Sequence, residues 1–192
     1  LDAPQLDADA LIKRLSMYRL RADVTITTTD LGVSRGIENA PSGAFLDPRH
    51  PNMGWRLYSD HDQSQDVDWT AQRVSHCIPE HGIELGPDSY ILEAGFERLN
   101  GVDFRKGCYV GQEVTARMKH KTELRKGFET VSIEGSADIG TPIIADDGKD
   151  VGTLYSQANG QAIRIEDGHL TAAHHNQSCV WRVIFKTNAT RP

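Results

Sequence analysis

The chain has 192 residues, which is enough for one sizeable domain or two small ones with a buried core. Its apolar fraction of 38% and charged fraction of 25% are typical of globular proteins and exclude an intrinsically disordered chain. The formal net charge of -6 argues against sequence-independent nucleic-acid binding, which needs many Lys and Arg contacts to phosphate. No apolar run approaches the roughly 20 residues of a membrane-spanning helix, so we expect neither nucleic acid nor a membrane as a partner.

The cysteine pattern indicates the redox environment and limits the kinds of metal site. Cys77, Cys108 and Cys179 lie far apart and form no CxxC pair, which predicts neither a disulfide framework nor a self-contained zinc site. The eight histidines show no HxxxH spacing, and the pair His174-His175 alone specifies no metal geometry. We therefore expect a cytoplasmic protein in a reducing compartment, and not a stand-alone metalloenzyme.

Hydrophobic periodicity predicts the first elements of the chain. Apolar residues at helical spacing predict a helix over residues 9–18. The pattern then changes to strict alternation, which predicts a half-buried strand over residues 20–28. A second strand is expected over residues 54–58, directly after a rigid turn that contains two prolines.

Two further helices are expected before residue 101. Apolar residues on one face predict a helix over residues 66–78, closed by Pro79. A third helix is expected over residues 88–99, because Asp88 or Ser89 can cap its start. The pair Asn100-Gly101 then supplies a left-handed stop.

The last third of the chain has the character of a β domain. Short apolar runs separated by Gly and Asp turns are typical of a small barrel or sandwich. These runs cover residues 128–133, 142–144, 151–155, 162–165 and 180–185. We place a domain boundary near residues 119–125, which gives an N-terminal domain of residues 1–122 and a C-terminal domain of residues 123–192. The fold class is therefore α+β.

The loop around Cys108 carries the residues best suited to chemistry. A thiolate is the nucleophilic and metal-ligating form of cysteine, and the adjacent cations of Arg105 and Lys106 favour that form. Gly107 and Gly111 flank the cysteine and allow a ligand or partner to approach the backbone closely. From these residues alone two interpretations stay open: a reactive thiol, or a small buried apolar side chain in a turn.

Residues 92–113 resemble the signature of the YgfZ family. The most specific part of the match is the run Lys106-Gly107-Cys108-Tyr109-Val110-Gly111-Gln112-Glu113. YgfZ proteins are folate-binding proteins of iron-sulfur cluster assembly or repair, and they are related to the T-protein of glycine cleavage, an aminomethyltransferase. Further segments that look like the family are Tyr18–Val24, Asp47–Arg49, Gly54–Arg56, Gly140–Ile143 and Val151–Thr153.

The resemblance implies a folate-binding, T-protein-like domain followed by a small C-terminal β-barrel. It also implies a role in maturing iron-sulfur proteins for which the motif cysteine, Cys108, is required. Family members carry a stretch of the folate domain ahead of the first helix of this sequence. We therefore expect part of that domain to be absent from the chain.

The resemblance also implies tetrahydrofolate as the cofactor and Glu93 as its contact, because a carboxylate can accept two parallel hydrogen bonds from a pterin. A solvated helix-face glutamate is the alternative that the residue type alone leaves open. The basic cluster of residues 117–121 could hold the anionic glutamate tail of folate, or could simply be a solvated face. The other cofactor-binding residues that we expect are Lys106, Gly107, Tyr109, Gly111, Gln112, Glu113 and Arg117.

These features predict an accessory factor for iron-sulfur assembly, and not a conventional enzyme. Its partners would be iron-sulfur carrier or client proteins. Any cluster would be transient and shared, since clusters take about four protein ligands and this chain would contribute Cys108 alone. The alternative is a tetrahydrofolate-dependent transferase of one-carbon groups, of the aminomethyltransferase type. A thiol redox module is disfavoured, because no resolving cysteine lies near Cys108 in sequence.

Overall fold

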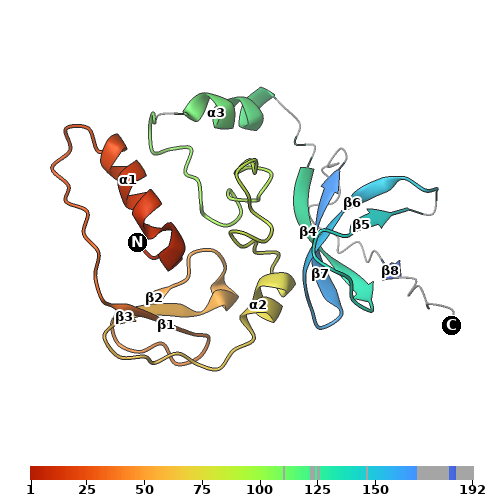
Figure 1. Ribbon diagram of the computed structural model, residues 1–192, viewed down its shortest axis with the longest axis horizontal. Coiled ribbons are helices and arrows are strands. Elements are labelled where there is room, and N and C mark those ends of the chain that lie inside the picture. Colours follow the sequence, from red (N-terminus) through yellow and green to blue (C-terminus); the bar gives the residue numbers. More distant parts are fainter. Residues whose placement is uncertain (110, 122–123, 125, 146, 168–181, 185–192) are drawn as a thin grey trace. The chain divides into compact units, whose positions relative to one another are not determined.

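A computed structural model describes residues 1–109, 111–121, 124, 126–145, 147–167 and 182–184 of the chain (Figure 1). The chain divides into two compact units, which are described one at a time. The first unit comprises Leu1–Leu46 and Gly54–Asp66, and the second comprises Asp47–Met53 and Val67–Pro192. The domain boundary predicted between residues 122 and 123 falls within the range of the second unit and stays a prediction.

The first unit contains a helix and a small antiparallel sheet (Figure 1). A 3-10 turn, η1 (Gln5–Asp7), leads into α1 (Ala8–Tyr18), which confirms the helix predicted over residues 9–18. The sheet has the strand order β1-β3-β2, with β1 (Gly32–Gly36) and β2 (Phe45–Leu46) both antiparallel to β3 (Trp55–Ser59). Strand β3 confirms the strand predicted over residues 54–58.

The strand predicted over residues 20–28 is wrong. The chain turns at Leu20, whose φ is +50°, and then continues without regular secondary structure to Leu31. The side chains of Leu20 and Val24 are exposed, so their face of the alternating pattern is not buried. Alternation predicts a strand only where a neighbouring strand supplies the hydrogen bonds and an apolar face to pack against.

Gly54 and Trp55 fix the start of β3 against β1. Gly54 has a φ of +67°, and a Cβ atom there would lie 1.9 Å from the carbonyl oxygen of Gly36. The indole of the buried Trp55 donates a hydrogen bond of 2.9 Å to the carbonyl of Glu38. The backbone approaches closely here because glycine has no side chain, and this approach sets the pairing of the two strands.

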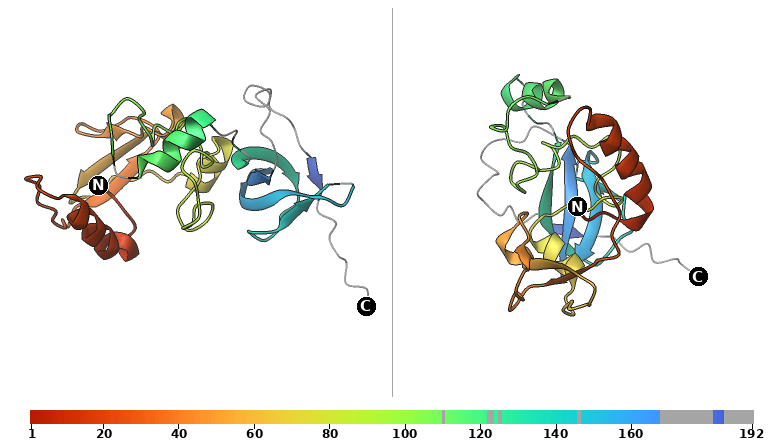
Figure 2. Two further views of the ribbon diagram at one scale, coloured as in Figure 1. Left: turned by 90° about the horizontal axis from the view of Figure 1, so that it is seen from above. Right: turned by 90° about the vertical axis from the view of Figure 1, so that its left-hand side faces the viewer.

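The second unit is built on a five-stranded sheet with the order β5-β6-β7-β4-β8, which twists and curves along its strands (Figure 2). Its neighbouring strands are antiparallel except for the parallel pair of β4 and β8. The strands are β4 (Lys126–Glu134), β5 (Pro142–Ile144), β6 (Asp150–Ala158), β7 (Gln161–Asp167) and β8 (Arg182–Ile184). The predicted β runs and the mixed α+β class are thus confirmed, whereas the closure of this sheet into a barrel stays a prediction.

One face of the sheet carries its own apolar core. The buried side chains are Val131, Ile133, Ile143, Leu154 and Ala162. They alternate with polar or half-buried residues along β4 and β6, as expected when successive side chains point to opposite faces. Strands β4, β5, β6 and β7 therefore each contribute side chains to one hydrophobic cluster on this face of the sheet.

Helix α2 (Trp69–Ser75) lies in the second unit and is shorter than the predicted range of residues 66–78. It begins at its cap, Asp68, whose carboxylate accepts a hydrogen bond of 2.9 Å from the amide of Ala71. After the helix, Ile78 packs with Met53 and Leu99 in a second buried cluster. This cluster attaches the segment before residue 101 to the proline-rich turn around residue 51.

The third helix predicted over residues 88–99 is wrong. The segment forms a series of hydrogen-bonded turns, and Gly95 in its middle has a φ of +74°, which interrupts the helical dihedrals. The left-handed conformation predicted at Asn100 is present, with a φ of +56°, although it ends a series of turns and not a helix. Instead, the third helix of the structure is α3 (Gln112–Lys121), which directly follows the Cys108 loop. No helix in the described part of the chain is long and apolar enough to cross a membrane.

Candidate functional site

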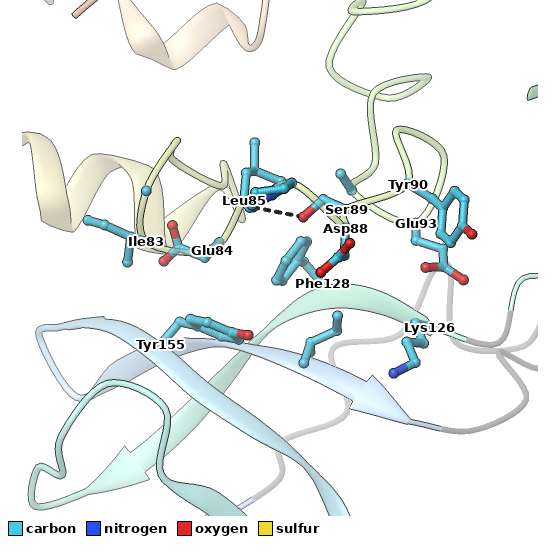
Figure 3. A pocket seen from close by; sticks show the side chains of 15 residues that line it. Ile83, Glu84, Leu85, Asp88, Ser89, Tyr90, Glu93, Lys126, Phe128 and Tyr155 are labelled. Atoms are coloured by element: carbon cyan, nitrogen blue, oxygen red, sulfur yellow. Dashed lines mark hydrogen bonds between the residues drawn. The ribbon is translucent and has the colours of Figure 1, made fainter. Parts of the chain in front are cut away.

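An open pocket of about 490 Å³ lies in the second unit between residues 82–94 and the five-stranded sheet (Figure 3). Its volume falls in the range of small-molecule sites. One wall is the loop of residues 82–90 together with Glu93 and Ala94. The opposite wall is formed by side chains from three strands, Lys126 and Phe128 of β4, Tyr155 of β6 and Ile165 of β7.

The sheet wall of the pocket is aromatic. The rings of Phe128 and Tyr155 meet edge to face, with their centroids 5.9 Å apart and an interplanar angle of 76°. Such a pair offers an apolar surface to a planar ligand while the phenol retains a polar end. Together with Ile165, these rings form the apolar part of the pocket.

The loop wall supplies carboxylates. Glu93 is half-buried, and Figure 3 shows its side chain directed toward the sheet, above Lys126. Asp88 lines the same wall and is exposed. The adjacent turn is held by the hydroxyl of Ser89, which accepts a hydrogen bond of 2.9 Å from the amide of Gly86. The pocket thus combines an aromatic surface with anionic hydrogen-bond acceptors.

The Cys108 loop presents its thiol at the surface, since Cys108 is exposed. Gly107 and Gly111 have φ values of +89° and +87°, and a Cβ atom at either would meet nothing within 4 Å. Only a glycine adopts these dihedrals without strain, so both positions are explained by the backbone path. Because the side chain of Cys108 is exposed, the interpretation of Cys108 as a buried apolar side chain is wrong.

The rest of this loop is tied together by local contacts. The amide of Tyr109 donates a hydrogen bond of 3.1 Å to the side chain of Gln112, the first residue of α3. The ammonium of Lys106 lies 4.5 Å from the centroid of the Tyr109 ring. The guanidinium of the exposed Arg105 lies 3.6 Å from the carboxylate of Asp103. Lys106, Tyr109 and Gln112 thus contact one another within the loop, and their role in binding a cofactor stays a prediction.

Cys77 has the opposite environment. It follows α2 with a φ of +51°, and burial raises the pKa of its thiol to about 11. A thiol with so high a pKa is poorly suited to act as a nucleophile or a metal ligand at neutral pH. Cys179 lies outside the described residues. Between Cys77 and Cys108, only Cys108 combines exposure with a loop that a partner could approach.

The predicted basic cluster on α3 is only partly free to bind an anion. The ammonium of Lys119 lies 2.6 Å from the carboxylate of Glu97 and 5.2 Å from the centroid of the Phe104 ring. Lys119 therefore attaches α3 to the preceding turns. Arg117 and His120 are exposed, as is Glu113 at the start of the helix.

Glu93 and the Cys108 loop form two separate features among the described residues. None of the pocket-lining residues comes from the loop of residues 105–113. The family resemblance pointed to Glu93 but gave no indication that Lys126, Phe128 and Tyr155 line the same pocket. Phe128 and Tyr155 belong to predicted strands, yet the alternation within a strand does not indicate which segment covers its outer face.

Known relatives of the chain carry a consistent name. The chain is similar to the iron-sulfur cluster assembly factor IBA57, mitochondrial, of Mus musculus, with 36% identity over 152 residues, or 66% of this chain and 42% of the relative. The Homo sapiens protein of the same name is 34% identical over 143 residues, which are 61% of this chain and 40% of that protein.

A fungal relative extends the match. The iron-sulfur cluster assembly factor IBA57 homolog, mitochondrial, of Phaeosphaeria nodorum is 32% identical over 171 residues, which are 74% of this chain and 41% of the relative. The chain thus spans about two fifths of the length of these relatives. No protein-family model matches it.

Proposed function

Because the chain belongs to the IBA57/YgfZ family of iron-sulfur cluster assembly factors, we propose that it is a folate-binding accessory protein that presents the Cys108 thiolate to an iron-sulfur partner. In this proposal the cluster is cargo, held briefly between Cys108 and ligands of a carrier or client protein. The chain acts as an assembly or repair factor, and not as a transferase. The relatives are named as mitochondrial, and the cytoplasmic location of this chain stays a prediction.

The contrast between Cys108 and Cys77 is the observation that carries the proposal. Cys108 is exposed between two glycines, whereas the pKa of the Cys77 thiol is raised to about 11 by burial. A thiol must lose its proton to bind iron, and it must be reachable by the partner that supplies the remaining ligands. Among the residues that the structure describes, no group of three or more His, Cys, Asp or Glu side chains could hold a metal ion.

The pocket at Glu93 fits the pterin part of tetrahydrofolate in size and in chemistry. Its volume of about 490 Å³ suits a ligand of that class, and the rings of Phe128 and Tyr155 offer it an apolar surface. We propose that Glu93 accepts hydrogen bonds from the amino and ring N-H groups. When bound, tetrahydrofolate would supply the one-carbon chemistry of its N5 and N10 atoms.

Cluster transfer to the chain tests the proposal directly. The protein is mixed anaerobically with a cluster-loaded carrier, and complex formation is followed by visible absorption and size-exclusion chromatography. We expect a cluster-containing complex with the wild type and with Cys77→Ser, but not with Cys108→Ser. The two serine variants are matched, because each removes one thiol. A complex with Cys108→Ser that equals the wild type, or a stable cluster in the isolated monomer, would contradict the proposal.

A further inference from the structure

A buried ion pair lies beneath the Glu93 pocket, between α2 and the loop that forms one pocket wall. The side chain of Arg73 is 7% exposed and that of Glu84 is fully buried, and the two groups are 3.3 Å apart. Glu84 belongs to the loop wall of the pocket, whereas Arg73 is not among the lining residues. Both lie in the second unit of the chain.

The hydrogen bonds of this pair join the two walls of the pocket. One oxygen of Glu84 accepts from the amide of Glu80 at 2.8 Å, and the other accepts from the amide of Ser156 at 3.1 Å. The guanidinium of Arg73 donates to the Ser156 hydroxyl at 3.1 Å and to the carbonyl of Ile78 at 3.1 Å. The carboxylate therefore connects the start of the loop wall to β6.

Ser156 lies where β6 departs from regular pairing. The register between β6 and β7 shifts between Leu154 and Gln157, so that Tyr155 and Ser156 occupy the irregularity. A bulge of this kind re-aims the side chains of its strand. Tyr155, which it carries, is one of the two aromatic residues of the sheet wall. The Glu84 carboxylate thus holds the backbone at the residue next to Tyr155.

Simple attachment of α2 to the sheet does not require this pair. The hydroxyl of Thr130 on β4 already donates a hydrogen bond of 2.6 Å to the carbonyl of Val74 on α2. Apolar side chains of similar volume generally stabilise a buried contact at least as well as an ion pair does. The ion pair adds a defined geometry, because its donors and acceptors bind specific atoms on both sides of the pocket.

We propose that Arg73 and Glu84 are positioning residues that set the distance between the loop wall and Tyr155, and thereby the affinity of the pocket for a folate. The proposal rests on the function proposed above for its ligand. It also makes a claim about the free protein: without Glu84, the loop and the bulge of β6 move independently.

The test compares Glu84→Gln with Glu129→Gln. A carboxamide has only one acceptor oxygen, so the variant side chain cannot accept from both amides that the Glu84 carboxylate holds. Glu129 pairs with the buried Arg164 in the same sheet, and neither residue lines the pocket. Because neighbouring strand residues face opposite sides, this control disturbs the face away from Phe128.

Two measurements are made on each protein: hydrogen exchange of peptides covering residues 80–86 and 154–158, and calorimetric affinity for 5-formyltetrahydrofolate. For Glu84→Gln we expect faster exchange in both peptides and an affinity at least tenfold weaker. For Glu129→Gln we expect neither change. If Glu84→Gln does not fold, Ser156→Ala removes only one acceptor of Arg73, and it should weaken binding severalfold.

The outcomes separate the two proposals. An affinity of Glu84→Gln, or of Ser156→Ala in its place, that equals the wild type would overturn the positioning role. An equal loss in Glu129→Gln would overturn it too, because the effect would then follow general destabilisation. If the wild type does not bind the folate, the folate proposal fails, and hydrogen exchange alone then tests the positioning role. In that case, hydrogen exchange at residues 154–158 that is unchanged in the variant would overturn the positioning role.

Discussion

The imidazole rings of His50 and His76 stack face to face, with their centroids 4.1 Å apart and an interplanar angle of 18°. His50 lies in the proline-rich turn, and His76 follows α2. The backbone amide of Asn52 donates to Nδ1 of His50 at 3.2 Å, so that nitrogen acts as an acceptor. The stack places the ring of His76 directly against a second imidazole.

This stack predicts a loss of stability in mild acid. Burial, the neighbouring His50 and the cation of Arg98 hold the pKa of His76 below its ordinary value of 6.5. The unfolded chain consequently binds a proton at higher pH than the folded chain does, and the free energy of unfolding decreases as the pH falls below about 6.5. Urea unfolding at pH 7.5 and at pH 5.5 measures this decrease.

The matched variants for that experiment are His76→Gln and His61→Gln. His76→Gln should show a smaller drop in unfolding midpoint between the two pH values than the wild type. His61 is 83% exposed, so its replacement should leave the drop unchanged. A wild-type drop that survives intact in His76→Gln would show that other groups are responsible.

The cysteines should differ in their reactivity. With a pKa of about 11, only roughly a thousandth of Cys77 is thiolate at pH 8, whereas Cys108 is exposed. We expect iodoacetamide to modify Cys108 first in the native protein and Cys77 only slowly until the chain is unfolded. Alkylation at several pH values with mass mapping follows each cysteine, including Cys179. Faster native modification of Cys77 or Cys179 would refute the assignment of Cys108 as the reactive thiol.

Local sequence patterns predicted the elements whose own apolar residues follow a regular helical or alternating spacing. The helix α1 and the strands β3 to β7 follow from helical or alternating spacing of apolar residues. Strand β1 was missed because Gly32 and Gly36 begin and end it, and glycine is unfavourable in strands. Helix α3 was missed because the preceding motif indicated a loop that continues past Gln112.

The site could be predicted only in part for a related reason. The Cys108 loop is one continuous segment, so its sequence shows the glycines and cations that surround the thiol. The Glu93 pocket instead joins residues from distant segments, such as Phe128 and Tyr155. The pair of Arg73 and Glu84 could not be predicted either, because nothing in the sequence around these residues indicates that both charges are buried. Long-range pairing of this kind has no local signal in the chain.

Replacing Glu93 should weaken folate binding without unfolding the protein. Glu93→Gln removes the negative charge from the proposed acceptor, and hydrogen bonds to charged groups contribute roughly 1.5–3 kcal/mol. We therefore expect calorimetry to show binding of tetrahydrofolate that is about 10- to 150-fold weaker. Glu97→Gln is the control, since Glu97 pairs with Lys119 and does not line the pocket. An unchanged affinity in Glu93→Gln would assign Glu93 to the solvated surface.

The close approach at Gly54 should make this glycine irreplaceable. Gly54→Ala places a methyl group against the backbone of Gly36, where a Cβ atom would lie 1.9 Å from the carbonyl oxygen. The backbone must move, because a carbonyl cannot rotate away as a flexible side chain could. Overpacking of this kind costs roughly 1–3 kcal/mol, in addition to roughly 1–2 kcal/mol for the left-handed dihedrals.

Gly43→Ala separates these two contributions within the same unit. Gly43 also has a positive φ, of +85°, but its nearest neighbour would be the Leu57 side chain at 3.9 Å, an ordinary contact. Its alanine variant should therefore lose only the dihedral contribution. Urea unfolding followed by tryptophan fluorescence compares the two, since Trp55 reports on this sheet. Equal losses in the two variants would mean that the sheet relaxes around the methyl group added by Gly54→Ala, and that the approach of Gly54 to Gly36 does not constrain the pairing of β1 with β3.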